Sequence, residues 1–315
     1  MNQASKLTAD WTPPVLPADM MHGDMPGDRI QIEPQHIRKA DTLFPHVRAE
    51  LAALLDAHPQ HRAVIGICGG SGVGKSEIAS VLGEYLKQLG VGAYILSGDN
   101  YPHRIPRDND LERQRVYRTG GLRGLLMSGC YREDQGPALR ELWQAETDAD
   151  PRTAAERPWM AVYQQAAERS LDAYLGTPAE IDFEEVNGII SAFKNGADRI
   201  PLKRMGREPE ALWYSPVDFT GTQVLIIEWT HSNSDYLRGV DLPILLNSTP
   251  AETLAHRRAR ARDGKTDSAF TTTVLRLEQT KLEHQAHKAK IIISKNGEIL
   301  SYAQYRRLMA EEVSA

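Results

Sequence analysis

Short apolar runs alternate along the chain with longer stretches in which apolar residues recur every three or four positions. The short runs predict buried β-strands, and the longer stretches predict amphipathic helices. Strands are expected at 62–68, 91–99, 222–229, 241–247 and 290–297. Helices are expected at 40–59, 76–90, 182–198, 250–263 and 271–289. Because strands and helices alternate, we predict an α/β fold with a doubly wound parallel sheet.

Two segments depart from this alternation. Residues 1–35 are rich in Pro, Asp, Met and Gly, which predicts an irregular N-terminal arm ahead of a domain that spans 36–315. Residues 111–178 are rich in charged and aromatic side chains and predict a mainly helical insertion in that domain. Within it, Gly120–Gly121 and Pro137 are expected to break the helices.

The composition argues against several classes of protein. The chain has 315 residues and a formal net charge of -5, so the overall positive charge typical of nucleic-acid-binding proteins is absent. No apolar stretch approaches the roughly 18 residues needed to cross a membrane, and the start of the chain lacks a signal-peptide pattern. Two cysteines without a CxxC pair indicate no disulfide framework. We therefore expect a cytoplasmic protein without nucleic-acid or membrane partners, and a homodimer is compatible with the sequence.

The sequence GGSGVGKS at 69–76 lies between a predicted strand and a predicted helix. It fits the G-x-x-x-x-G-K-S pattern of a P-loop, whose glycines let backbone N–H groups converge on phosphate oxygens. The dipole of the following helix and the Lys75 ammonium favour the outer phosphates, and the Ser76 hydroxyl is expected to bind Mg²⁺. Nucleotide binding is therefore predicted for Gly69, Gly70, Ser71, Gly72, Val73, Gly74, Lys75 and Ser76.

A carboxylate follows the next predicted strand, in LSGDNYPHR at 96–104. Asp99 is expected to face the same crevice as the P-loop, because the carboxyl ends of parallel strands meet at one edge of the sheet. There it is suited to accept a proton from an acceptor hydroxyl that attacks the γ-phosphoryl group. The alternative is an aspartate that caps a helix or turn. Tyr101, His103 and Arg104 are candidates for holding the acceptor.

Two further charged features complete the candidate site. Glu228 ends the apolar strand VLIIE at the usual Walker B position, where a carboxylate contacts Mg²⁺ directly or through water. A solvated glutamate at a sheet edge is the alternative. The arginine-rich segment at 257–262 predicts a mobile basic lid over the phosphates, in preference to a solvated helix face. Arg258 and Arg262 are its candidates for stabilising charge during transfer, and Arg258 is also a candidate nucleotide contact.

Together these segments resemble, in the same order, the phosphoribulokinase/uridine kinase family of P-loop kinases. The similarity covers about 62–110 and 180–300 and includes DFEEVNGIISAFKNGADRIPLKRMGRE, which resembles the helix, turn and proline-containing strand of that family. The resemblance implies the P-loop kinase fold, with Lys203 and Arg204 near the acceptor and Asn296 in the loop beside the adenine. It also implies that Asp99 is the catalytic base.

The chain departs from the family pattern in two places. Trp229 follows the strand glutamate, where the family often has glycine. The segment 111–178 has no counterpart and lies where family members shape the acceptor pocket. Its arginines are compatible either with an anionic acceptor or with an ordinary charged helical surface. These arginines are Arg113, Arg115, Arg118, Arg123 and Arg132.

These features predict an ATP- and Mg²⁺-dependent kinase that phosphorylates a hydroxyl of a small, anionic or neutral metabolite. One alternative is a nucleotide-hydrolysing switch or assembly factor acting on a protein partner. The segment SKNG at 294–297 lacks the Asp of a guanine-specific N-K-x-D motif, which argues weakly against a GTP switch. A binding protein that transfers nothing and an adenylylsulfate kinase-like enzyme are further alternatives.

Overall fold

The computed structural model describes residues 3–8, 10–28, 30–260 and 268–314. The chain forms two compact units, each assembled from segments that are distant in the sequence. The first comprises Met1–Tyr101, Asp182–Thr253 and Leu282–Ala315, and the second comprises Pro102–Ile181 and Leu254–Lys281. The insertion predicted at 111–178 therefore belongs to a larger unit that also takes in a later part of the chain.

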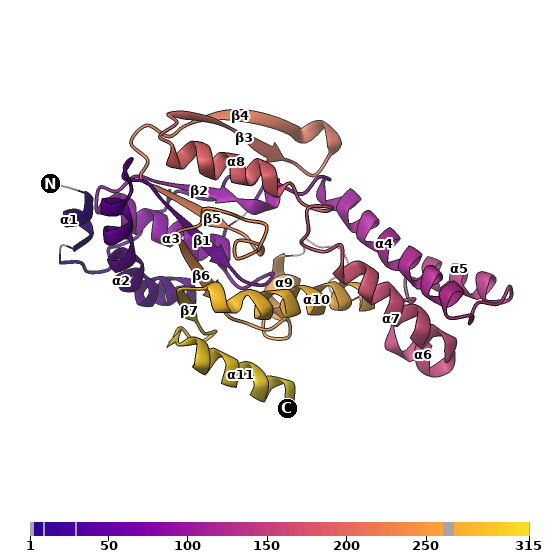
Figure 1. Ribbon diagram of the computed structural model, residues 1–315. Helices are drawn as coiled ribbons and strands as arrows, with labels where there is room; N and C mark the ends of the chain where they lie inside the picture. Colours follow the sequence, from indigo (N-terminus) through magenta and orange to yellow (C-terminus); the bar gives the residue numbers. More distant parts are fainter. Residues whose placement is uncertain (1–2, 9, 29, 261–267, 315) are drawn as a thin grey trace. The chain divides into compact units, whose positions relative to one another are not determined.

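A six-stranded sheet forms the core of the first unit (Figure 1). Its strand order is β2-β5-β1-β6-β7-β8, and only β8 is antiparallel to its neighbour. The strands are β1 (Ala63–Cys68), β2 (Ala93–Ser97), β5 (Val224–Glu228), β6 (Leu242–Leu246), β7 (Ile291–Ile293) and β8 (Ile299–Leu300). The predicted α/β fold with a mainly parallel sheet is confirmed, and each of the five predicted strands is present.

Helices cover both faces of the sheet, which buries alternate residues of each strand against different partners. Ile65 and Ile67 of β1 belong to a core cluster with side chains of α2 and α3, whereas Cys68 joins a separate cluster with Tyr305 of α11. The helices of this unit are α1 (Gln3–Thr8), α2 (Pro34–Ala57), α3 (Lys75–Gln88), α8 (Phe183–Lys194) and α11 (Tyr302–Ser314). An antiparallel hairpin of β3 (Arg199–Met205) and β4 (Leu212–Asp218) follows α8. The described part of this unit also contains the short 3₁₀ turns η1 (Gly98–Asn100), η2 (Pro209–Ala211) and η3 (Ala286–Lys288).

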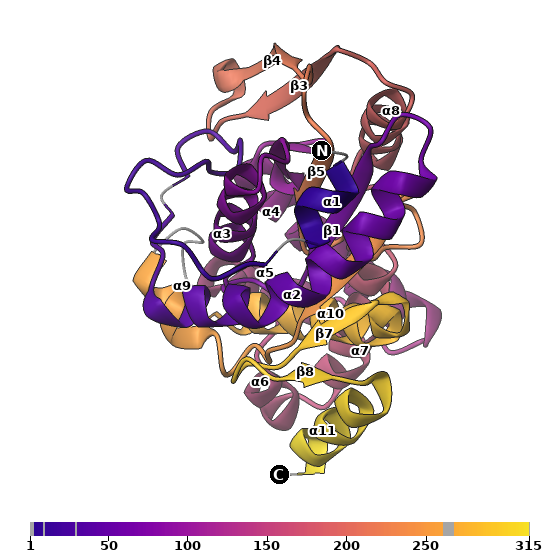
Figure 2. The ribbon, with the colours of Figure 1, turned by 90° about the vertical axis from the view of Figure 1, so that its left-hand side faces the viewer.

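The N-terminal arm packs on the first unit instead of extending away from it. Its first helix, α1, lies beside α2 (Figure 2), and Leu7 is fully buried there. The indole of Trp11 contacts the rings of Phe44 and Tyr85, with centroid distances of 4.7 Å and 5.2 Å. The described residues of the arm between α1 and α2 have no regular secondary structure.

The second unit is mainly helical. Its own apolar cluster includes Tyr117, Met160, Tyr163 and Leu171. The helices are α4 (Pro106–Met127), α5 (Gln135–Ala145), α6 (Pro151–Glu156), α7 (Trp159–Asp172), α9 (Leu254–Arg260) and α10 (Ala269–Gln285), of which α10 continues into the first unit. Within the described residues, no helix of the chain is both long and apolar enough to cross a membrane.

The predicted helix breaks at Gly120–Gly121 and Pro137 are wrong. Gly120 and Gly121 lie inside α4, and Pro137 lies in the first turn of α5, where a missing backbone N–H costs little. The two glycines are needed for close packing of α4 on α7. A Cβ would lie 2.2 Å from the Ser170 hydroxyl oxygen at position 120 and 2.4 Å from the Tyr163 ring at position 121.

We expect Gly121→Ala to destabilise the second unit. Overpacking of this kind costs about 1–3 kcal/mol, which outweighs the gain of roughly 1 kcal/mol that alanine brings to a helix interior. Thermal unfolding followed by circular dichroism measures the change. The matched control is Gly136→Ala in α5, where a Cβ would meet its nearest atom at an ordinary 3.6 Å. Equal melting temperatures for the two variants would argue against the close α4–α7 contact.

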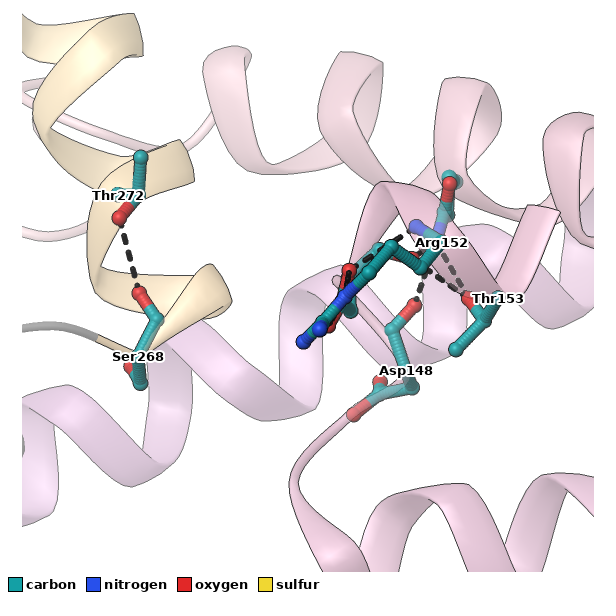
Figure 3. A network of polar contacts seen from close by, with 7 residues as sticks. Asp148, Arg152, Thr153, Ser268 and Thr272 are labelled. Atoms are coloured by element: carbon teal, nitrogen blue, oxygen red, sulfur yellow. Dashed lines mark hydrogen bonds and ion pairs between the residues drawn. The ribbon is translucent and has the colours of Figure 1, made fainter. Parts of the chain in front are cut away.

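Polar contacts order the chain between α5 and α7 (Figure 3). Asp150 caps α6 by accepting the Arg152 backbone N–H, and the Gln164 amide donates to the Asp148 and Asp150 carbonyl oxygens and to the Thr153 hydroxyl. A separate contact at the start of α10 joins the Thr272 hydroxyl to the Ser268 carbonyl at 3.0 Å. Of these contacts, the one made by Asp150 satisfies a backbone N–H that the start of α6 leaves without an intrahelical partner.

Candidate active site

The P-loop has the strand–loop–helix context that the sequence predicts, since it joins β1 to α3. Gly74 caps α3 with φ +96°, and a Cβ there would lie 2.9 Å from the His36 ring. At Gly69, a Cβ would lie 2.8 Å from the Leu246 carbonyl oxygen. A side chain at either position would therefore displace the loop, so the glycines serve the loop geometry.

Lys75 and Ser76 start α3, directly after the loop. The Lys75 ammonium lies across the loop and donates to the Gly70 carbonyl oxygen at 3.0 Å. The Ser76 hydroxyl points to the end of β5 and donates to Glu228 Oε2 at 3.1 Å. The structure thus brings together the lysine, the serine and the strand-end glutamate that the sequence singles out. Val73 has a buried side chain, and its contact with nucleotide stays a prediction.

Glu228 is buried at the carboxyl end of β5, an interior strand of the sheet, which excludes the alternative of a solvated glutamate. Burial raises the pKa of its carboxyl to about 8 and the charge of Asp99 adds to the rise, whereas Lys75 and hydrogen bonds from Ser97 and Ser76 oppose it. A carboxylate in such surroundings is stabilised by a nearby cation. Its oxygens and the Ser76 hydroxyl are the hard donors that Mg²⁺ prefers, so the residues fit this ion.

The described residues contain no group of three or more His, Cys, Asp and Glu side chains that gathers around one point. The Ser76 and Glu228 oxygens therefore fit an ion that is held by one or two protein oxygens together with the phosphates of a substrate.

Asp99 is exposed and lies in η1, just beyond β2. Strand register brings it to Glu228, because Ser97 pairs with Glu228 across β2 and β5. The electrostatic effect of Asp99 on Glu228 reflects this proximity. The predicted meeting of the two carboxylates at one edge of the sheet is therefore observed, while the role of Asp99 as base stays a prediction.

Trp229, the departure from the family pattern, packs against the turn that carries Asp99. Its indole is buried and contacts the rings of Phe183 and His231, with centroid distances of 5.4 Å and 5.3 Å. A Cβ at Gly98 would lie 1.9 Å from the indole. The tryptophan and Gly98 thus form a matched pair, a relation that sequence reasoning did not find because the residues are distant along the chain.

The N-terminal arm also reaches this edge of the sheet. A Cβ at Gly23 would lie 3.5 Å from Glu228 Oε1, and the buried Asp24 carboxylate accepts the Ser97 backbone N–H at 2.8 Å. Neither Gly23 nor Asp24 belongs to a sequence motif. The composition of the arm predicts an irregular segment but does not predict that the arm contacts the candidate active site.

Lys203 and Arg204, expected near the acceptor, point to different surroundings, as neighbours on a strand must. Lys203 is buried, and burial lowers the pKa of its ammonium group. The nearby charges of Glu185 and Asp182 partly offset this decrease. Arg204 forms an ion pair with Asp24, with an Nη1–Oδ2 distance of 2.7 Å. The charge of Arg204 is therefore directed at the arm.

Tyr101 follows η1 and is fully buried. Among the described residues its hydroxyl has no hydrogen-bond partner. Burial raises the pKa of this phenol far above its ordinary value, so it stays protonated and can donate a hydrogen bond.

Among the other candidates, His103 and Arg104 contact residues of their own unit. In the second unit, His103 Nε2 is 3.0 Å from the Pro178 carbonyl oxygen, and Arg104 donates to the Tyr174 hydroxyl at 3.2 Å. Arg258 is exposed on α9, and Arg262 lies outside the described residues. In the first unit, Asn296 is exposed in the turn between β7 and β8.

Three of the arginines considered for an anionic acceptor have carboxylate partners inside the second unit. Arg113 pairs with the buried Glu180 at 2.6 Å, Arg115 with Glu112 at 2.6 Å, and Arg118 with Asp148 at 3.3 Å. Since each of these positive charges is already balanced by a carboxylate, the ion pairs favour a structural role for the three arginines over binding of an anionic acceptor.

Comparison with known proteins connects the chain to kinases. The family model for adenylylsulphate kinase matches residues 61–123, from just before the P-loop into α4. The bifunctional α-galactosidase/sucrose kinase AgaSK of Mediterraneibacter gnavus is 39% identical over 244 residues, which cover 78% of this chain and 21% of that protein. An adenylyl-sulfate kinase of Erwinia tasmaniensis is 40% identical over 72 residues, covering 21% of this chain and 36% of that enzyme. The chain thus spans well under half the length of these curated relatives.

Among solved structures, D-glycerate 3-kinase from Cryptococcus neoformans var. grubii aligns with 85% of this chain and 98% of its own, with a TM-score of 0.45 and 10% identity.

Proposed function

We propose that this chain, a relative of P-loop kinases, transfers the γ-phosphoryl group of ATP to a hydroxyl of a small neutral sugar, with sucrose as the first candidate. The observation that carries the proposal is the meeting of Ser76, Glu228 and Asp99 beside the P-loop. The choice of acceptor is supported by 39% identity, across 78% of the chain, to a relative whose name includes sucrose kinase.

The phosphates would be held by the P-loop. Lys75 and the backbone N–H groups of the loop bind the β- and γ-phosphates. Ser76 and Glu228 would hold Mg²⁺, which supplies positive charge to the phosphate oxygens when bound. Arg258 and Arg262 are proposed to stabilise the charge of the transferring group.

Asp99 would accept the proton of the acceptor hydroxyl. The hydroxyl oxygen forms a bond to the γ-phosphorus as the bond from that phosphorus to the β–γ bridging oxygen breaks. The products are ADP and a phosphorylated sugar. Tyr101, whose hydroxyl is buried and protonated, is the proposed donor to a second hydroxyl of the sugar, and Lys203, His103 and Arg104 are further proposed contacts.

A neutral acceptor is favoured over an anionic one by the ion pairs of the second unit. The guanidinium groups of Arg113, Arg115 and Arg118 already have carboxylate partners. A phosphorylated or carboxylated acceptor would have to displace these carboxylates, and at Arg113 and Arg118 this would leave the buried Glu180 and Asp148 without this counter-ion.

An acceptor screen tests the proposal. We expect purified protein with ATP and Mg²⁺ to release ADP faster when sucrose or a related neutral sugar is added than with glycerate, uridine or pantothenate. Mass spectrometry of the product checks that the sugar has gained one phosphoryl group.

Two outcomes would overturn the proposal. ADP release that no small molecule accelerates, but that a protein partner stimulates, would favour the nucleotide-hydrolysing switch. Conversion of adenylylsulfate at a higher kcat/KM than any sugar would favour an adenylylsulfate kinase.

A further inference from the structure

Three residues of the N-terminal arm lie against three separate parts of the candidate active site. His22 Nδ1 is 3.5 Å from the hydroxyl of Ser80 on α3, one turn beyond Ser76. The Cα of Gly23 faces Glu228, where an added Cβ would come within 3.5 Å of Oε1. Asp24 reaches the end of β2. The arm therefore contacts the P-loop helix, the Glu228 strand and the strand that leads to Asp99.

Asp24 uses both carboxylate oxygens, and they serve different segments. Oδ1 accepts the Ser97 backbone N–H at 2.8 Å and the Asn100 side-chain amide at 3.1 Å. Oδ2 accepts the Tyr94 hydroxyl at 2.9 Å and Arg204 Nη1 at 2.7 Å. One oxygen thus binds both ends of the turn that carries Asp99, and the other binds β2 and the β3–β4 hairpin.

The turn is connected to the candidate catalytic groups through the residues that Asp24 holds. The Ser97 hydroxyl makes a hydrogen bond to Glu228, and Asn100 is adjacent to Asp99. Asn100 Oδ1 in turn accepts the Met205 backbone N–H at 2.9 Å, which links the turn to β3. A shift of the Asp24 carboxylate would therefore move Ser97 and Asn100 together.

Stability gained from the Asp24–Arg204 ion pair alone is not expected to account for this arrangement. Asp24 and Arg204 are nearly inaccessible to solvent, and burial raises the pKa of Asp24 although Arg204 opposes the rise. A buried ion pair is often no more stabilising than apolar residues of similar volume, so its value lies in fixing geometry.

We propose that Asp24 is a positioning residue of the active site, which holds the turn 98–100 so that Asp99 and Glu228 face the P-loop. This inference rests on the proposed function, because that function gives Asp99 its catalytic role and Glu228 its Mg²⁺-binding role. It assigns the arm a part in placing the groups that react.

The test is Asp24→Asn, which keeps the shape of the side chain. Because Arg204 carries a full positive charge, it is expected to attract the amide oxygen of the new asparagine. The amide nitrogen then faces the Ser97 backbone N–H. Both groups are hydrogen-bond donors, so the contact with Ser97 is lost. Loss of such a supporting contact lowers metal affinity or activity by about 10–100-fold. We expect a loss of this size in kcat with the best sugar, with KM for ATP within about threefold.

Two further measurements do not require the acceptor. Hydrogen exchange should be faster at the Ser97–Asn100 amides of Asp24→Asn and unchanged in the core strand β1. The gain in ATP affinity on replacing EDTA with Mg²⁺ should fall by up to about threefold, while ATP affinity in EDTA stays constant. If the wild-type protein phosphorylates nothing in the screen, the proposed function fails, and these two measurements still decide the role of Asp24.

Tyr94→Phe is the matched control, because it removes a partner of Oδ2 and leaves the Ser97 and Asn100 contacts in place. It should lower stability without reducing kcat. If Asp24→Asn fails to fold, Asn100→Ala tests the same link from its other end and keeps the Asp24–Arg204 pair. Unchanged exchange and an unchanged Mg²⁺ effect in the folded variant would overturn the proposal, as would equal losses of kcat in Asp24→Asn and Tyr94→Phe.

Discussion

Replacement of Asp99 by asparagine is expected to lower kcat for sugar phosphorylation by about 10²–10⁴-fold, the usual contribution of a general base. Asparagine has nearly the same shape but cannot accept the proton of the attacking hydroxyl. Asp99 is exposed in η1, just after β2, and is not part of the P-loop at 69–76. The Kd for ATP should therefore stay within about threefold, as measured by titration calorimetry.

The control for Asp99→Asn is Asp198→Asn, which removes an exposed carboxylate just before β3. We expect this variant to keep the wild-type kcat and melting temperature. If Asp99→Asn also turns over at the wild-type rate, the proton is accepted elsewhere and Asp99 has no part in the chemical step. A loss of ATP affinity as large as the loss of kcat would instead assign Asp99 to nucleotide binding.

Replacement of Gly98 by alanine is expected to disturb both the fold and the reaction. The added Cβ would lie 1.9 Å from the Trp229 indole, which is buried and packed between aromatic rings. Relief of the overlap requires a movement of the turn that carries Asp99. We expect the free energy of unfolding to fall by about 1–3 kcal/mol, and kcat by roughly 10²-fold, the cost of a misplacement near 1 Å.

Gly188→Ala is the control for this substitution, because a Cβ at that exposed position of α8 would meet nothing within 4 Å. It should be neutral or stabilising by up to about 1 kcal/mol. Chemical denaturation and steady-state ADP release measure the two effects. A Gly98→Ala protein with wild-type kcat would show that the turn tolerates displacement, and would remove the basis for its role in placing Asp99.

Much of the site could be predicted because its signals are local. The P-loop is a contiguous pattern between a strand and a helix, Asp99 comes just after an apolar strand, and Glu228 is the last residue of another. Once parallel strands are recognised, their carboxyl ends are expected at one edge, and the pairing of Ser97 with Glu228 fulfils this expectation. The helix breaks failed for the opposite reason, since Gly120 and Gly121 serve contacts with α7 that a helical pattern in α4 cannot show.

The sequence by itself therefore determined the α/β class, the P-loop and the two strand-end carboxylates, because hydrophobic period and short motifs depend on neighbouring residues. Only the tertiary structure decided the contacts between distant segments. It brought Asp24 to the turn 98–100 and Trp229 against Gly98, and it balanced Arg113 with Glu180. Such contacts depend on how the elements pack in three dimensions. The sequence around a carboxylate in an irregular arm has no periodic pattern from which its hydrogen-bond partners could be predicted.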